Sequence, residues 1–242
     1  FDAPKPEALL SDLQLSPQNF NARVDIPRDS KFYAALNSTR GQAVDLDRVA
    51  AIYCALTERQ RNAPSDALAQ QIRRAFDSES PGFGSAQTNR AALVALSMLV
   101  VAPEAGRIAG EIAPRIKSCR MDAPEIKLLG RADLAKHWAL SAAMTGTFGS
   151  ALSQAMGTWK EVSDSGPAGS GFSFVDLAAD RSGIYFGQRA TRENEAIAVA
   201  HELSRATEED ILPMQALSLI EGIDERQFNQ RFEDTDSASY AR

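Results

Sequence analysis

The most constraining feature of this sequence is a run of 22 residues without a charged side chain, Trp138–Trp159. A helix of that length is long enough to cross a membrane. The run is rich in Gly, Ser and Thr and contains only two Leu and one Phe, so its transfer into lipid would be marginal. A helical segment surrounded by other protein helices fits this composition better. We therefore predict no transmembrane span.

Small residues recur at every fourth position of this run: Ser141, Thr145, Gly149, Ser153 and Gly157. On one continuous helix they would form a face with little bulk, against which another helix backbone can pack closely. Alternatively, Gly146 and Gly149 break the run into a helical hairpin, because glycine costs about 1 kcal/mol relative to alanine inside a helix. The sequence leaves both arrangements open.

Helical periodicity dominates the rest of the chain, and strand signals are nearly absent. Apolar residues at helical spacing or helix-start signals predict helices over 44–61, 64–76, 86–102, Pro103 to near Cys119, Gly130 onward through His137, and 190–206. We predict an all-α fold: a single multi-helix, bundle-like domain over 44–232 with a central Gly/Ala/Ser-rich helical hairpin. An irregular N-terminal arm, 1–43, and a polar tail, 233–242, complete the predicted organisation.

Charge and motifs exclude several classes of function. The chain has 26 Lys+Arg against 32 Asp+Glu and a net charge of −6, which argues against a dedicated nucleic-acid binder. It has no Walker A sequence, no strand-linked G-x-G-x-x-G and no G-x-S-x-G elbow. His201-Glu202 lacks the second histidine of a zincin, because residue 205 is Arg205. We predict a surface or structural role for His201.

The first residues and the cysteines bear on location. The chain begins at Phe1 with a Pro-rich stretch, which is typical of a mature exported protein, although a trimmed sequence would begin in the same way. We predict a periplasmic or otherwise exported protein with an envelope or membrane-associated partner. Cys54 and Cys119 could pair in an oxidising compartment, but two cysteines alone favour free, inert thiols.

Residues of catalytic type are concentrated between residues 131 and 180. The candidate catalytic residues are His137, Glu161, Asp164, Asp176 and Asp180, with Arg131, Asp133, Lys160 and Ser173 in supporting positions. The spacing places Glu161 with Asp164, and Asp176 with Asp180, on single helix faces. Asp133 lies four residues before His137, so we expect its carboxylate to hydrogen-bond the imidazole and fix its tautomer.

A shared site requires the chain to fold back. On one unbroken helix His137 and Glu161 would be roughly 36 Å apart, at about 1.5 Å per residue. If the chain turns at Gly149, each residue lies about 18 Å from the turn along its own arm, and the two come level. The proposed centre therefore depends on a break near Gly146–Gly149.

Two kinds of function remain for this group. A histidine with several carboxylates on facing helices can hold Mg²⁺, Mn²⁺, Zn²⁺ or iron, and the sequence does not choose among these metals. Such a site, or His137 as a general base without metal, would suit a hydrolase. Alternatively, the same residues join three helices in a buried hydrogen-bond and ion-pair network of a non-catalytic protein. Single residues also have simpler roles open to them: Ser173 and Asp176 can form a helix cap, and Asp180 can form a surface salt bridge with Arg181. Substrate and oligomeric state are not predicted.

The segment 131–187 has the form R-x-D-L-x-x-H-W, then G-x-x-K-E-x-x-D-S, then G-F-S-F-x-D-L-A-A-D-R-x-G. It resembles the VanZ-like family and related small bacterial envelope lipoproteins, and the whole chain is similar to uncharacterised proteobacterial proteins. The positions that match the family pattern are His137, Glu161, Asp164, Ser173, Asp176, Asp180 and Gly183. The family's usual Asn is Asp180 here, and its hairpin normally spans a membrane. The resemblance implies an envelope location and a functional polar cluster on a helical hairpin.

Overall fold

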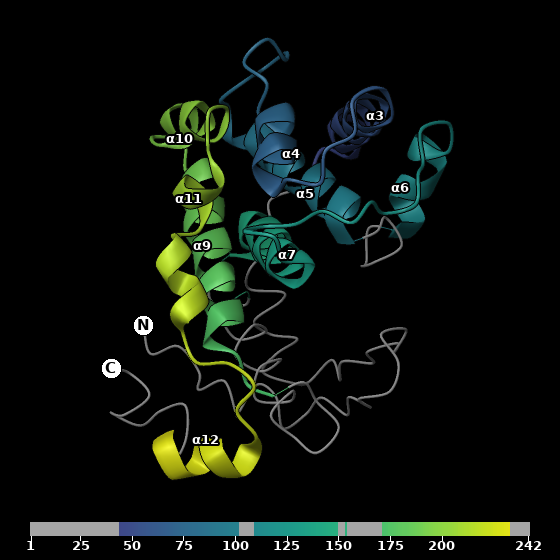
Figure 1. Ribbon diagram of the computed structural model, residues 1–242. Helices are drawn as coiled ribbons and strands as arrows, with labels where there is room; N and C mark the ends of the chain where they lie inside the picture. Colours follow the sequence, from purple (N-terminus) through teal and green to yellow (C-terminus); the bar gives the residue numbers. More distant parts are fainter. Residues whose placement is uncertain (1–43, 102–108, 150–152, 154–170, 233–242) are drawn as a thin grey trace, which may run out of the picture.

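The computed structural model describes residues 44–101, 109–149, 153 and 171–232, and within them the chain is all-α, as predicted (Figure 1). The described residues form no strand, only three isolated β-bridges. The predicted arm 1–43, the tail 233–242, and Lys160, Glu161 and Asp164 lie outside the described residues. The helices are α3 (Leu46–Asn62), α4 (Leu68–Ala75), α5 (Ala86–Val101), α6 (Ala109–Ile116), α7 (Ala132–Phe148), α9 (Phe174–Ala190), α10 (Ala196–Leu203), α11 (Glu208–Ile211), the 3₁₀ helix η1 (Met214–Ser218) and α12 (Glu225–Phe232).

Helix α5 forms the centre of the core. It contacts α3, α4, α7, α9 and α10, and nearly every residue from Ala91 to Val100 is buried. The reason is visible in the sequence, because this stretch is apolar on all faces and can only be stable with protein on every side. Of the buried polar residues near its start, Asn89 is 1% exposed and donates hydrogen bonds to the carbonyls of Ala190 and Ala196. Asn89 thereby holds the junction of α9 and α10 against α5.

Helices α7 and α9 make the most extensive contact in the described part of the chain, and they approach backbone to backbone. A Cβ atom added at Gly187 would lie 2.6 Å from the carbonyl oxygen of Ala142, and one at Gly183 would collide with the carbonyl oxygen of Trp138. The facing positions on α7 include Ser141 and Thr145, whose Cβ atoms are the next neighbours. Two residues of the predicted small-residue series, Ser141 and Thr145, thus pack against a second helix, and two glycines supply the other half of the contact.

Helix α7 ends where the hairpin prediction requires. Its last residue is Phe148, and Gly149 follows with a φ of 90°, a conformation that favours glycine. The Ser153 hydroxyl donates to the Ser141 carbonyl at 3.1 Å, whereas a continuous helix would separate these residues by about 18 Å. The single-rod alternative is therefore wrong. None of the described helices combines the length and apolar character needed to cross a membrane.

The two cysteines are joined, so the expectation of free thiols is wrong. Cys54 on α3 and Cys119, just beyond α6, form a disulfide with their Cα atoms 5.2 Å apart. The sequence could not show this pairing, because it depends on α3 and α6 packing against each other. Arg61, near the end of α3, strengthens the same contact by donating to the carbonyls of Cys119 and Arg120.

Helix α4 begins later than the sequence indicates. We expected a helix from Pro64, but α4 starts at Leu68. The preceding residues pair with a distant segment instead: the Leu68 N–H donates to the Lys127 carbonyl at 2.8 Å, and the Lys127 N–H donates to the Asp66 carbonyl at 2.6 Å. Helix α6 also ends before the predicted Cys119, at Ile116.

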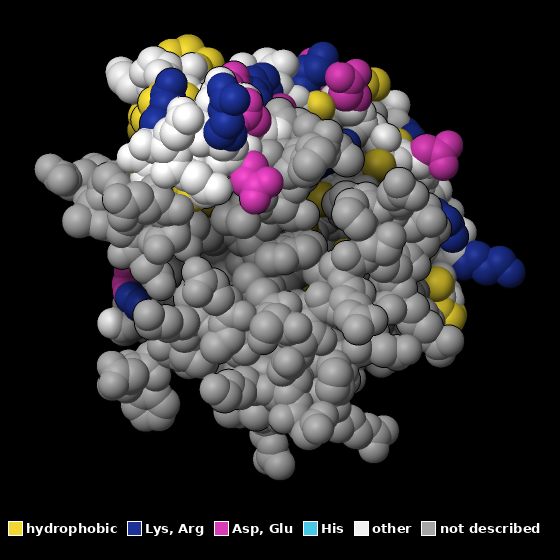
Figure 2. All heavy atoms as spheres, turned by 90° about the horizontal axis from the view of Figure 1, so that it is seen from below, with side chains coloured by type: hydrophobic (Ala, Val, Ile, Leu, Met, Phe, Trp, Pro, Cys, Tyr) yellow, Lys and Arg dark blue, Asp and Glu magenta, His cyan; other side chains and the backbone are white. Residues whose placement is uncertain are grey.

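Helix α12 lies apart from the other helices (Figure 1) and belongs to a second, aromatic cluster. Phe228 of α12 stacks on Phe172, with ring centroids 4.6 Å apart, and Leu177 and Ile223 complete the buried group. In the view from below, described Lys or Arg side chains lie near Asp or Glu side chains along the upper margin of the picture (Figure 2).

A buried polar cluster between α7 and α9

The centre of the candidate site is His137, whose ring lies between two carboxylates of the facing helix. Nδ1 is 3.1 Å from Asp180 Oδ1, and Nε2 is 3.4 Å from Asp176 Oδ2. The three side chains are only 9%, 6% and 12% exposed, in the order His137, Asp180, Asp176. One turn of α9 separates the two aspartates, as the i, i+4 spacing predicts, and the ring of His137 lies between their carboxylates.

Ser141 is a member of the cluster that our sequence analysis did not assign to it. Its hydroxyl donates to Asp180 Oδ1 at 2.6 Å, the same oxygen that faces His137. The signal was present, since Ser141 lies four residues after His137 and therefore on the same face of α7. Two i, i+4 pairs thus oppose each other across the helix contact, His137 and Ser141 on α7 against Asp176 and Asp180 on α9.

Arg131 connects the cluster to the surface at the start of α7. Its guanidinium donates to both carboxylate oxygens of Asp133, at 3.2 and 2.6 Å, and to Glu221 at 2.7 Å, and it lies 3.7 Å from Asp176. Hydrogen bonds to Asp133 and Glu221 raise the pKa of Arg131 despite its partial burial. Burial, the largest single influence, raises the pKa of Asp133, but the hydrogen bonds and positive charge of Arg131 together with backbone hydrogen bonds hold that pKa below its ordinary value.

Three expectations about this region need correction or confirmation. Asp133 binds Arg131 and not His137, because the guanidinium two residues earlier offers it a two-pronged contact. The surface pair of Asp180 with Arg181 is also wrong, since Asp180 points inward to His137 and Ser141. The predicted cap is present: the Ser173 hydroxyl accepts a hydrogen bond from the Asp176 N–H.

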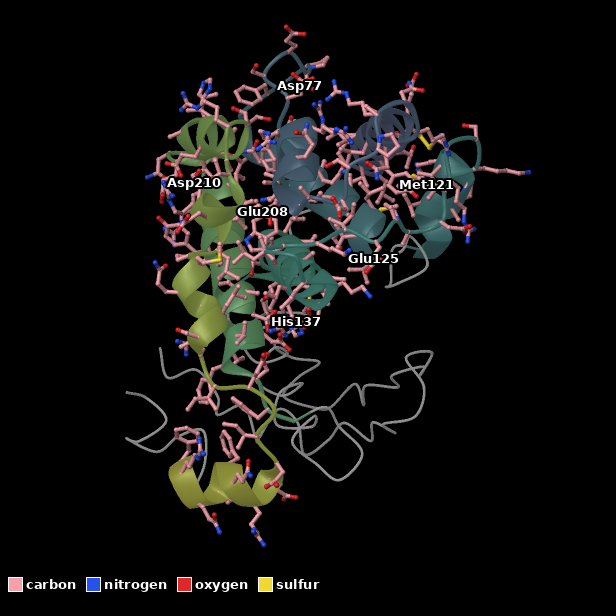
Figure 3. All side chains as sticks on the ribbon, viewed as in Figure 1. Asp77, Met121, Glu125, His137, Glu208 and Asp210 are labelled. Atoms are coloured by element: carbon pink, nitrogen blue, oxygen red, sulfur yellow. A yellow bond between two sulfur atoms is a disulfide. The ribbon has the colours of Figure 1, made fainter. Side chains whose placement is uncertain are left out.

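The remaining sequence candidates do not join this cluster among the described residues. Glu161, Asp164 and Lys160 lie outside them. His201 is exposed on α10, where its ring meets Phe83 edge to face at 5.0 Å. Figure 3 shows His137 at the lower part of α7, on the side of the helical body away from Asp77.

The cluster places one basic ring, His137, between two acidic side chains, Asp176 and Asp180. An ionised carboxylate can only accept hydrogen bonds, whereas an imidazole nitrogen donates one when it carries hydrogen. Asp180 Oδ2 is buried and accepts no hydrogen bond within the described part of the chain. In the same part of the chain, no group of three or more His, Cys, Asp or Glu side chains is arranged to hold a metal ion. Each ring nitrogen of His137 faces a carboxylate oxygen within ion-pair distance.

Comparisons of the chain with protein-family models, with curated proteins and with solved structures give no match. These comparisons therefore assign no function to the chain.

Proposed function

We propose that the protein is a non-catalytic, exported protein of the bacterial envelope, in which the cluster around His137 joins helices. The observation that carries this proposal is the position of the imidazole between Asp176 and Asp180, with all three side chains at most 12% exposed. A ring whose two nitrogens both face carboxylates is engaged in holding α7 to α9. A general base needs one of these nitrogens to reach a substrate.

The disulfide supports the exported location. Disulfides persist in oxidising compartments and are rare in the bacterial cytoplasm, and Cys54–Cys119 links two helices of the main core. The resemblance of 131–187 to VanZ-like envelope proteins points in the same direction. The hydrolase interpretation uses the same His137, and it is the alternative that substitution of this histidine tests.

The test measures metal content and stability together, in purified full-length chain and in the His137→Ala variant. Under our proposal the wild-type protein holds no stoichiometric metal, and the variant loses about 3–5 kcal/mol of unfolding free energy, because two buried carboxylates lose their shared partner. Lys136→Ala, one residue away on an exposed position of α7, is the matched control and should change stability by less than about 0.5 kcal/mol.

Stoichiometric metal in the wild type that is lost in His137→Ala, with little change in stability, would overturn the proposal and favour the hydrolase. An unchanged unfolding free energy without metal would also contradict it, because the cluster would then not join the helices.

A further inference from the structure

A second feature, remote from His137, is a cleft of about 470 Å³ between α3 and the residues that connect α4 to α5. Cavities of roughly 300–1,000 Å³ are typical of small-molecule sites. Asp77, at the edge of this cleft, and His137 lie at opposite ends of the helical body (Figure 3). The cleft shares no lining residue with the His137 cluster, so a ligand bound there is independent of the function proposed for that cluster.

The walls of the cleft are mainly apolar. On α3, two small residues one turn apart, Ala51 and Ala55, are exposed and line the cleft together with the longer side chains of Arg48, Ile52 and Arg59. The opposite wall is aromatic and aliphatic, from Phe76, Phe83 and Ala92. The small residues of α3 leave the space, and the larger residues opposite provide an apolar surface for a ligand.

The opposite wall is preformed around Arg48. Its Nη1 donates to the Pro81 carbonyl and to the Thr88 hydroxyl, both at 3.0 Å. Gly82 has a φ of 75°, and a Cβ atom there would lie 2.9 Å from both Arg48 Nη1 and Thr88 Oγ1. The connecting segment is therefore fitted to the arginine, and the cleft does not need a ligand to exist.

Three aspartates and three arginines line the cleft, but their ion pairs leave one of these arginines without a carboxylate partner among the described residues. Each lining aspartate has an arginine partner: Asp45 with Arg48, Asp47 with Arg115, and Asp77 with Arg59. Arg74 is different, because its hydrogen bonds go to neutral acceptors, the Ala63 carbonyl and the side chains of Gln60 and Gln71. No carboxylate of the described residues forms an ion pair with it, and Arg59 and Arg73 add positive charge nearby.

We infer that this cleft binds a small anionic amphiphile, with a single negatively charged head near Arg74 and an apolar body along Ala51 and Ala55. Arginine binds a carboxylate or sulfonate head better than a cation or a neutral group because its fork of donors matches the anion's oxygens. The alanine wall contributes through burial of apolar surface.

Three ten-carbon probes separate head-group preference from simple hydrophobicity: decanoate, decyltrimethylammonium and decanol, titrated calorimetrically into the full chain. We expect decanoate to bind saturably and at least tenfold more tightly than the other two. Equal binding of the cation or the alcohol would show that charge plays no part, and absence of saturable decanoate binding would overturn the inference.

Two variants locate the site. Ala55→Phe fills the cleft from an exposed helix position and should weaken decanoate binding at least tenfold, whereas Ala198→Phe, on an exposed position of α10 outside the cleft, should leave it unchanged. Arg74→Gln should remove the preference for decanoate over the ammonium probe. Arg74 also donates a hydrogen bond to the Ala63 carbonyl. If Arg74→Gln does not fold for that reason, the comparison of the two Phe variants decides alone. Unchanged decanoate affinity in Ala55→Phe would place the probe elsewhere and refute the assignment.

Discussion

The disulfide offers the most quantitative test of how the core is held. Cys54 and Cys119 are 65 residues apart in sequence, so their bond closes a long loop that the unfolded chain would otherwise explore freely. The loop-closure relation assigns about 4 kcal/mol to a loop of this size. For a chain of this length, that corresponds to a loss of roughly 8–16 °C in melting temperature when the bond is absent.

The assay is equilibrium urea unfolding with and without reductant, on the wild type and on Cys54→Ala/Cys119→Ala. Reduction of the wild type and removal of both thiols should each lower the free energy of unfolding by about 4 kcal/mol. The double variant is the internal control, because reductant should leave its unfolding curve unchanged.

The reasoning would be refuted by a loss below about 1 kcal/mol. Such a result would mean that the noncovalent contacts between α3 and α6 already restrict the same loop in the unfolded ensemble. Among those contacts are the bonds from Arg61 to the Cys119 and Arg120 carbonyls. Arg61→Ala in the double variant would then have a larger effect than in the oxidised wild type, which thermal melting can measure.

Three further predictions concern single sites. Gly183→Ala should lower the free energy of unfolding by about 1–3 kcal/mol, because the new methyl group overpacks against the Trp138 carbonyl. Gly146→Ala should cost less in the same urea assay, because a Cβ atom there meets first a Thr191 methyl group, at 3.3 Å. Equal losses would contradict the backbone contact at Gly183. Asn89→Ala should lower the free energy of unfolding in urea by about 2–4 kcal/mol, since it removes two buried hydrogen bonds to main-chain carbonyls, and a loss under 0.5 kcal/mol would contradict the importance of these bonds. The folded-state pKa of Asp133 is depressed, so its ionised carboxylate stabilises the fold above the unfolded-state pKa of about 4, and this stabilisation is lost as pH falls below that value. Asp133→Asn should therefore reduce the fall of melting temperature with decreasing pH. An unaltered fall would contradict the Arg131 contact.

Local sequence signals predicted much of the α7–α9 cluster. The i, i+4 spacing of Asp176 and Asp180 placed both on one face, and Gly149 marked the end of α7. One local contact was predicted wrongly, because Asp133 faces Arg131, two residues before it, and not His137. Contacts between distant segments could not be predicted at all, and the disulfide, which depends on the packing of α3 on α6, is one of them.

The start of α4 is a second case in which a contact with a distant segment overrides a local sequence signal. Residues 64–67 carry a good helix-start signal, and helix propensity alone favours a helix there. The backbone bonds between Asp66, Leu68 and Lys127 override it, and Lys127 lies far along the chain. A short stretch of sequence contains no signal for backbone pairing with a segment so far along the chain.

The close approach at Gly183 and Gly187 has an evolutionary consequence. Because main chain meets main chain there, no exchange of neighbouring side chains can make room for a larger residue at either position. A distant relative can change its charged residues by swapping partners, but a bulkier residue at either position forces both helices to shift and pulls His137 away from Asp180. The two glycines, four positions apart, should therefore outlast the polar residues as the family's signature.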